Sequence, residues 1–153
     1  MVEEQVKIEL PVSYDEDIQN IIIDVAEEYG ISPTVMLALA EIESTGNPKV
    51  ISSTGDYGLM QINKFNHEWL SEELGITDWF DARQSAEAAC FMIKNLSDNY
   101  EECEDISQCL MAYNMGVNNA RPLWKQGIYE SEYSKKVLEK EAEISRVIDE
   151  RSE

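Results

Sequence analysis

Apolar side chains recur every three or four residues along most of the chain, which is the spacing of one face of an α-helix. The first such segment follows Ser13-Tyr14-Asp15-Glu16, a sequence typical of a capping box, and ends at Gly30, where a helix is expected to stop. Its regularly spaced apolar positions are Ile18, Ile21, Ile22 and Val25. The pattern predicts an amphipathic helix between the capping box and the glycine.

A second, more apolar helix is predicted from Ser32 to Glu43. Ser32 is a suitable N-cap, Pro33 suits the first helical position, and Gly46 stands just past the end. Both ends of this helix are therefore signalled by the local sequence.

Helical spacing continues through the rest of the chain. The longest helix is predicted from the N-cap Asp81 to Tyr100, and its small inward-facing residues would permit close packing. Further helices are predicted over residues 66–74, 106–114, 118–126 and 131–148, whereas only Val6, Ile8, Leu10 and Val12 alternate as a strand would. We expect a mainly α fold with little or no β structure, with an extended arm over 1–14, one helical domain over 15–148 and a fraying tail over 149–153.

Glu43 is the first candidate for chemistry. It follows Met36 and Leu39 by seven and four residues, so it lies in line with core-facing side chains. Desolvation there would disfavour the charged form, so the carboxyl could hold a proton near neutral pH and donate it to a leaving group. Glu41 points almost opposite, because two residues turn a helix by about 200°. The two acids therefore cannot flank one substrate bond.

Three ordered motifs give Glu43 its setting. Glu43-Ser44 is followed by Asn47-Pro48, by Ser52 and by Gly55-Asp56-Tyr57-Gly58-Leu59-Met60-Gln61-Ile62, and further along stand Ala112-Tyr113-Asn114-Met115-Gly116 and Tyr133 to Leu138. In order and spacing these segments resemble the signature of the soluble lytic transglycosylases, whose catalytic domain has a goose-lysozyme-like fold. The resemblance covers roughly Ile31 to Leu138.

The resemblance implies a mechanism that needs one acid. Glu43 would protonate the bridging oxygen between N-acetylmuramic acid and N-acetylglucosamine, and would then take a proton from the muramic acid's own 6-hydroxyl, which gives a 1,6-anhydro product. In the family's terms Met60 and Gln61 would line the glycan groove, and Ser52 would support Glu43 or its substrate. Met60 could equally be a core residue.

The other two motifs would complete the site. Tyr113 would place its phenol beside the acid, Asn114 would hold the loop of that tyrosine, and Tyr133 would close the site. A packing role on an amphipathic helix is the alternative for Tyr133.

Two other functions stay open. Goose-type lysozymes hydrolyse the same bond with water and carry Gln-Val-Asp, whereas this chain has Gln61-Ile62-Asn63. A neutral amide cannot act as a base for water, so the sequence favours the transglycosylase, while Asp56 keeps the hydrolase as the alternative. A domain that only binds glycan, or serves as a structural part of a phage or secretion machine, is the third interpretation. The pairing of Glu43 with Tyr113 speaks against it.

Composition limits the partners. The 153 residues suit one domain, and 43% are hydrophobic, which favours a globular protein. With 31 acidic and 12 basic residues the formal charge is -19, which argues against a nucleic-acid binder. We expect peptidoglycan strands as the partner, bound through a shaped groove, and a monomeric protein without a membrane span.

Metal or thiol chemistry is not indicated. His67 is the only histidine and the cysteines have no Cys-x-x-Cys spacing, so no metal or other cofactor is expected. Cys90 is expected in the core, and Cys103 could pair with Cys109 if the intervening segment bends back. No secretory signal is visible at the start, so a phage or prophage product and a truncated exported protein remain alternatives.

Overall fold

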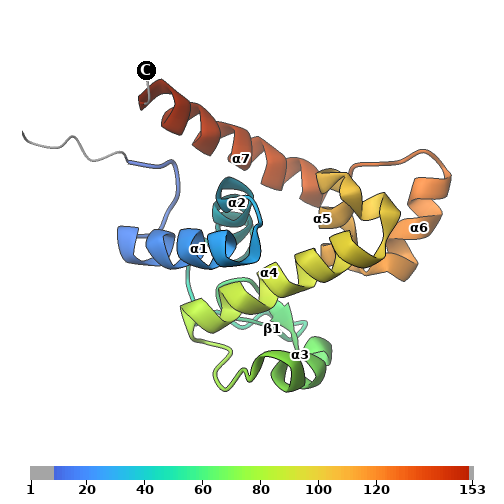
Figure 1. Ribbon diagram of the computed structural model, residues 1–153, viewed down its shortest axis with the longest axis horizontal. Coiled ribbons are helices and arrows are strands. Elements are labelled where there is room, and N and C mark those ends of the chain that lie inside the picture. Colours follow the sequence, from blue (N-terminus) through green and yellow to red (C-terminus); the bar gives the residue numbers. More distant parts are fainter. Residues whose placement is uncertain (1–8, 152–153) are drawn as a thin grey trace, which may run out of the picture.

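The computed structural model describes residues 9–151, which form a mainly helical fold (Figure 1). The α-helices are α1 (Glu16–Tyr29), α2 (Pro33–Ser44), α3 (His67–Leu74), α4 (Ala82–Asn99), α5 (Ile106–Met115), α6 (Val117–Lys125) and α7 (Glu132–Arg151). Two 3-10 turns, η1 (Lys64–Asn66) and η2 (Glu101–Glu104), precede α3 and α5. The expected mainly α fold with little β structure is confirmed.

The only sheet within residues 9–151 is a small hairpin. Strands β1 (Asp56–Tyr57) and β2 (Ile62–Asn63) pair antiparallel, with Asp56 opposite Asn63. The hairpin and α3 lie on the side of α4 that faces away from α7 (Figure 1).

Helix α2 forms the centre of the core and lies between α1 and α7 (Figure 1). Its residues from Val35 to Ala40 are all buried, so this helix is enclosed on every side. Ser32 caps it and Pro33 occupies its first turn, as predicted, while Thr45 in the left-handed region ends it directly before Gly46. A helix whose middle is enclosed therefore carries Glu43, itself half-buried, on its last turn.

The start of α1 differs from the sequence prediction. Asp15 is the N-cap, because its side chain accepts a hydrogen bond from the backbone N–H of Ile18. The predicted capping box led by Ser13 is wrong, since both donors of Ser13 are directed to Glu41 on α2 instead. The stop at Gly30 is confirmed, with a φ of 67°.

The remaining helices follow the sequence pattern. Asp81 caps α4 as predicted, and the small residues of α4 are buried against α1 and α5. Helices α3, α5 and α6 lie within one or two residues of their predicted bounds, whereas α7 continues past Ile148 to Arg151.

The strand-like pattern lies partly outside the described residues, which exclude Val6 and Ile8. Residues 9–14 form bends without a strand, and Leu10 and Val12 pack against the core. The Lys140 ammonium donates to the carbonyl of Pro11 at 3.1 Å, and the Tyr14 hydroxyl donates to that of Leu37 at 2.7 Å. These bonds hold the segment before α1 against α7 and α2.

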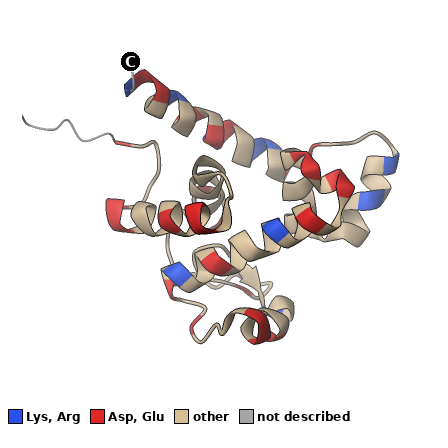
Figure 2. Cartoon of the chain, viewed as in Figure 1, with Lys and Arg blue, Asp and Glu red and all other residues tan. Residues whose placement is uncertain are grey.

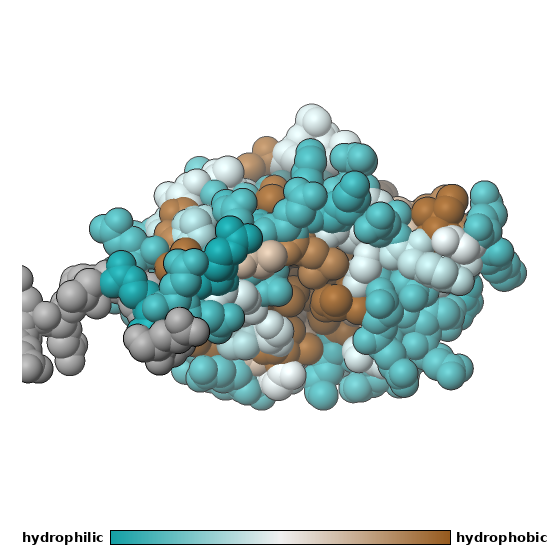
Figure 3. All heavy atoms as spheres, turned by 90° about the horizontal axis from the view of Figure 1, so that it is seen from above, coloured by the Kyte–Doolittle hydropathy of each residue, from teal (hydrophilic) through white to brown (hydrophobic). Residues whose placement is uncertain are grey.

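Acidic residues occur on most of the helices, and basic residues are few (Figure 2). Seen from above, hydrophilic residues cover most of the surface around smaller apolar areas (Figure 3). Cys90, Cys103 and Cys109 are buried free thiols. Among the described residues no helix has the length and apolar character to cross a membrane, and no group of metal-ligating side chains gathers.

Candidate active site

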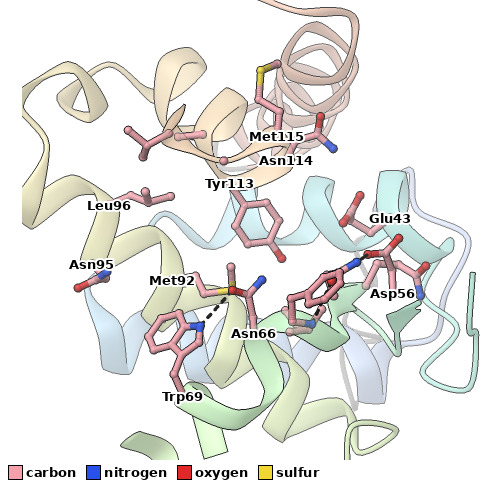
Figure 4. A pocket seen from close by; sticks show the side chains of 17 residues that line it. Glu43, Asp56, Asn66, Trp69, Met92, Asn95, Leu96, Tyr113, Asn114 and Met115 are labelled. Carbon is pink, nitrogen blue, oxygen red and sulfur yellow. Dashed lines mark hydrogen bonds between the residues drawn. The ribbon is translucent and has the colours of Figure 1, made fainter. Parts of the chain in front are cut away.

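A cleft of about 540 Å³ opens between the hairpin, α3 and α4 on one side and α5 with the start of α6 on the other (Figure 4). Its lining includes Glu43, Asp56 and Gln61 near the hairpin, and Tyr113 projects into the middle. Its size falls in the range of small-molecule sites in proteins.

Ser44 fixes Glu43 relative to the glycine loop. Its buried hydroxyl donates to the carbonyl of Leu59 at 2.7 Å and accepts from the N–H of Gly46 at 3.2 Å. The loop needs glycine at position 58, where φ is 79° and an added Cβ would lie 2.2 Å from the carbonyl oxygen of Trp79. The end of α2, the loop and the segment before α4 are thus held together.

Glu43 has the properties of a proton donor. The pKa of its carboxyl is raised to about 8, mainly by burial; the Tyr133 hydroxyl acts in the opposite direction, and the negative charge of Asp56 adds to the increase. The Glu43 side chain is therefore mostly protonated at neutral pH.

The pKa of Asp56 is shifted in the opposite direction from that of Glu43. Partial burial would raise its pKa, but hydrogen bonds from Asn63, Thr54 and Ser52 outweigh that effect and lower it. Ser52 and Thr54 donate to Oδ2 at 2.8 Å each, and Asn63 donates to Oδ1 at 3.0 Å. The hairpin register, which sets Asn63 opposite Asp56, creates this ionised carboxylate at the cleft.

The two tyrosines approach Glu43 differently. Tyr113 donates its hydroxyl hydrogen to the carbonyl of Met60 at 3.1 Å, so this donor is not free for Glu43. The buried Tyr133 hydroxyl interacts with Glu43, yet it makes no hydrogen bond of ordinary length and angle with any described residue. Burial, followed by the charge of Glu43, raises the pKa of both phenols well above its usual value. Both tyrosines therefore remain neutral next to the acid.

Of the other residues that the sequence predicted for the site, some line the cleft and others do not. Asn114 and Gln61 line the cleft, whereas Ser52 supports Asp56 instead of Glu43. Met60 does not line the cleft, which corrects the sequence expectation: its side chain is fully buried, because the turn directs it into the core. The backbone N–H of Met60 donates to the Ser85 hydroxyl at 3.0 Å.

Gln61 is held in an unusual conformation. Its φ of 53° is in the left-handed region, and its amide nitrogen donates to the carbonyls of Gly58 at 2.9 Å and Val50 at 3.1 Å. These two bonds occupy the donors of the Gln61 amide, so only its oxygen remains to meet a substrate donor in the cleft.

The far half of the cleft has no counterpart among the sequence candidates. It is lined by Phe65, Asn66, Trp69, Met92, Asn95 and Leu96, from η1, α3 and α4. Phe65 is 84% exposed, and this aromatic residue, two positions after the Gln61-Ile62-Asn63 stretch, is the one signal in the sequence.

The enclosed helix α2, the glycine loop and the acid-bearing cleft together define a lysozyme-like helical domain. The sequence model of the protein family described as "Transglycosylase SLT domain" matches residues 20–137 of this chain. The chain therefore belongs to the transglycosylase SLT domain family.

Curated relatives and a solved structure agree with this assignment. The chain is 29% identical over 93 residues to the transglycosylase of Enterobacteria phage PRD1, which covers 61% of this chain and 32% of the relative. It is 30% identical over 100 residues to membrane-bound lytic murein transglycosylase F of Desulfosudis oleivorans, covering 63% of this chain and 21% of the relative. An inactive Glu-to-Gln variant of the lytic transglycosylase Slt from Pseudomonas aeruginosa shares the fold at 17% identity, with a TM-score of 0.67 over 86% of this chain and 24% of that one. The chain thus spans about a third or less of each protein.

Proposed function

We propose that this domain is a peptidoglycan lytic transglycosylase that cleaves the β-1,4 bond between N-acetylmuramic acid and N-acetylglucosamine. The observation that carries the proposal is the Glu43 carboxyl, whose pKa of about 8 keeps it protonated in the cleft at neutral pH. Relatives named as lytic transglycosylases support the same substrate class.

In the first step Glu43 donates its proton to the bridging oxygen as the bond from that oxygen to C1 of the muramic acid breaks. The N-acetylglucosamine leaves with a hydroxyl at C4, and positive charge develops on the muramic acid ring. The ionised Asp56 carboxylate and the acetamido group of the same sugar would stabilise that charge.

In the second step the Glu43 carboxylate takes the proton of the 6-hydroxyl, and O6 forms a bond to C1. The product is a 1,6-anhydro ring, no water is consumed, and Glu43 returns to its protonated form. A carboxyl with a pKa near working pH suits both the donation and the return of one proton.

Hydrolysis of the same bond is the second candidate, and Asp56 favours it. Two carboxyls at one cleft with pKa values displaced in opposite directions are typical of glycosidases that use an acid and a second carboxylate. Asn63, at the position of the lysozyme aspartate, is a neutral amide that holds Asp56 in place.

Mass spectrometry of the products made in ¹⁸O-labelled water distinguishes the candidates. We expect muramic ends that lack the mass of water and carry no label. Reducing ends labelled with ¹⁸O would instead establish the hydrolase. If no fragments are released from any peptidoglycan, the result would support the interpretation that the domain binds glycan without cleaving it.

Asp56→Asn provides a second comparison between the two reactions. If Asp56 only stabilises charge, the variant slows the reaction and the products stay anhydro sugars. If Asp56 activates water, the fraction of labelled reducing ends falls in the variant.

A further inference from the structure

Asn66 and Trp69 form a fixed pair in the half of the cleft away from the hairpin (Figure 4). The indole Nε1 of Trp69 donates to Oδ1 of Asn66 at 3.0 Å. An indole N–H can only donate, so the atom that it meets must be the amide oxygen. The orientation of the Asn66 amide is therefore set by Trp69.

This arrangement leaves the Asn66 amide nitrogen as a donor that faces the cleft. In Figure 4 the nitrogen is turned away from Trp69, on the side of Tyr113. It makes no hydrogen bond with any residue between 9 and 151. A fixed donor that lines a cleft is suited to an acceptor atom on a ligand.

The surroundings of this donor favour a neutral acceptor beside an apolar group. Met92 and Leu96 line the same part of the cleft and offer apolar surface. Asp56 is ionised at the other end, and the chain carries a formal charge of -19, so a carboxylate ligand would be repelled. An acetamido group combines a neutral carbonyl oxygen with a methyl group and fits both features.

We infer that Asn66 is a specificity-determining residue that donates a hydrogen bond to the acetamido carbonyl of the N-acetylglucosamine next to the cleaved bond. The inference rests on the proposed function, in which the acetamido group of the muramic acid supports the developing charge and is engaged elsewhere. Trp69 acts as a positioning residue, because it keeps the donor of Asn66 toward the sugar.

The test compares Asn66→Asp with Asn47→Asp. An aspartate at position 66 still accepts from Trp69, so the fold is retained, but it offers no donor to a carbonyl. Asn47 is exposed outside the cleft, and its Oδ1 accepts from the N–H of Lys49 at 3.0 Å, so the control adds the same charge and keeps the same kind of bond. Asn66→Ala removes the donor without adding charge.

The measurement is kcat/KM on intact strands and on strands whose N-acetylglucosamine units have been de-N-acetylated. The unaltered protein and Asn47→Asp should prefer the acetylated strands by roughly tenfold, the value of about one hydrogen bond. Asn66→Asp and Asn66→Ala should lose that preference. A preference that survives in both variants would overturn the inference.

A second acceptor is available in peptidoglycan, because peptide stems also carry amide carbonyls. Strands freed of their peptides by an amidase separate the two sources. If Asn66→Ala no longer changes kcat/KM on peptide-free strands, Asn66 donates to a peptide carbonyl and the acetamido assignment is wrong.

Binding separates this inference from the proposed function. Calorimetry with the N-acetylglucosamine tetramer and the Glu43→Gln protein requires no turnover. Weaker binding by roughly tenfold when Asn66→Ala is added would support the inference even if the unaltered protein cleaves nothing, which would refute only the function. Equal affinity of the single and double variants would contradict the inference.

Discussion

Glu43 and Asp56 line one cleft with pKa values displaced in opposite directions, toward a protonated acid and an ionised carboxylate. Both displacements have local causes. Glu43 is desolvated at the end of an enclosed helix, while Asp56 accepts three hydrogen bonds at the edge of the hairpin. The difference provides a proton donor and a fixed negative charge within one cleft.

Glu43→Gln should lower turnover by roughly a thousandfold or more, because the amide keeps the shape of the side chain but cannot transfer a proton. The measurement is the rate of release of soluble fragments from purified peptidoglycan. Glu41→Gln is the control on the same helix, since Glu41 accepts hydrogen bonds from Ser13 outside the cleft. Equal losses of turnover in the two variants would show that Glu43 is not the catalytic acid.

The stability of the protein should fall between pH 4.5 and about 8 because of Glu43. In this range the unfolded chain has lost the proton of this carboxyl while the folded chain retains it, so raising the pH favours unfolding. Each pKa unit corresponds to about 1.4 kcal/mol, so the shift from 4.5 to about 8 corresponds to up to about 5 kcal/mol.

Thermal unfolding of the Glu43→Gln protein at a series of pH values measures this effect. Its Tm should exceed that of the unaltered protein at pH 8, and the difference should shrink toward pH 4.5. In parallel, turnover by the unaltered protein should fall as the pH rises through about 8, where Glu43 loses its proton. Curves that differ by a constant Tm at every pH would contradict the raised pKa.

Tyr113→Phe should affect stability as well as turnover. The variant removes the hydrogen bond to the carbonyl of Met60, which costs about 1 kcal/mol and lowers the Tm by roughly 2–4 °C. Turnover should fall by about tenfold, because the loop that carries Gln61 loses one of its attachments. Tyr57→Phe, in the hairpin outside the cleft lining, is the matched control. An unchanged Tm would show that the Met60 bond contributes nothing.

The sequence predicted the features that depend on short segments. Ser32 and Asp81 begin their helices as expected, since a cap is decided within one turn of chain. The local pattern around Ser13 favours a cap, but its partner in the folded chain, Glu41, is distant in the sequence. Periodicity alone could not decide whether Met60 belongs to the core or to the groove, and the turn around Gln61 directs Met60 inward.

The far half of the cleft could not be predicted for a similar reason. Asn66 and Trp69 stand on either side of the boundary between η1 and α3, and no motif includes them. Their role depends on the facing wall of α4, which contributes Met92 and Leu96 from a different part of the chain. Only the folded structure brings these segments together.

Ser44→Ala should show how far the position of Glu43 depends on its neighbour. Alanine suits the helix, but the carbonyl of Leu59 would lose its bond of 2.7 Å in a buried setting, at a cost of about 1–3 kcal/mol. The Tm should fall by several degrees, and water entering beside the loosened loop should lower the pKa of Glu43, so that turnover declines at a lower pH than in the unaltered protein.

Ser97→Ala, at an exposed position of α4, is the control for the loss of a hydroxyl from a helix. It should leave both the Tm and the pH profile in place. If Ser44→Ala lowers the Tm but its turnover declines at the same pH as in the unaltered protein, then the bond to Leu59 stabilises the fold without setting the pKa of Glu43. In that case the enclosed helix α2 alone would account for the desolvation of the acid.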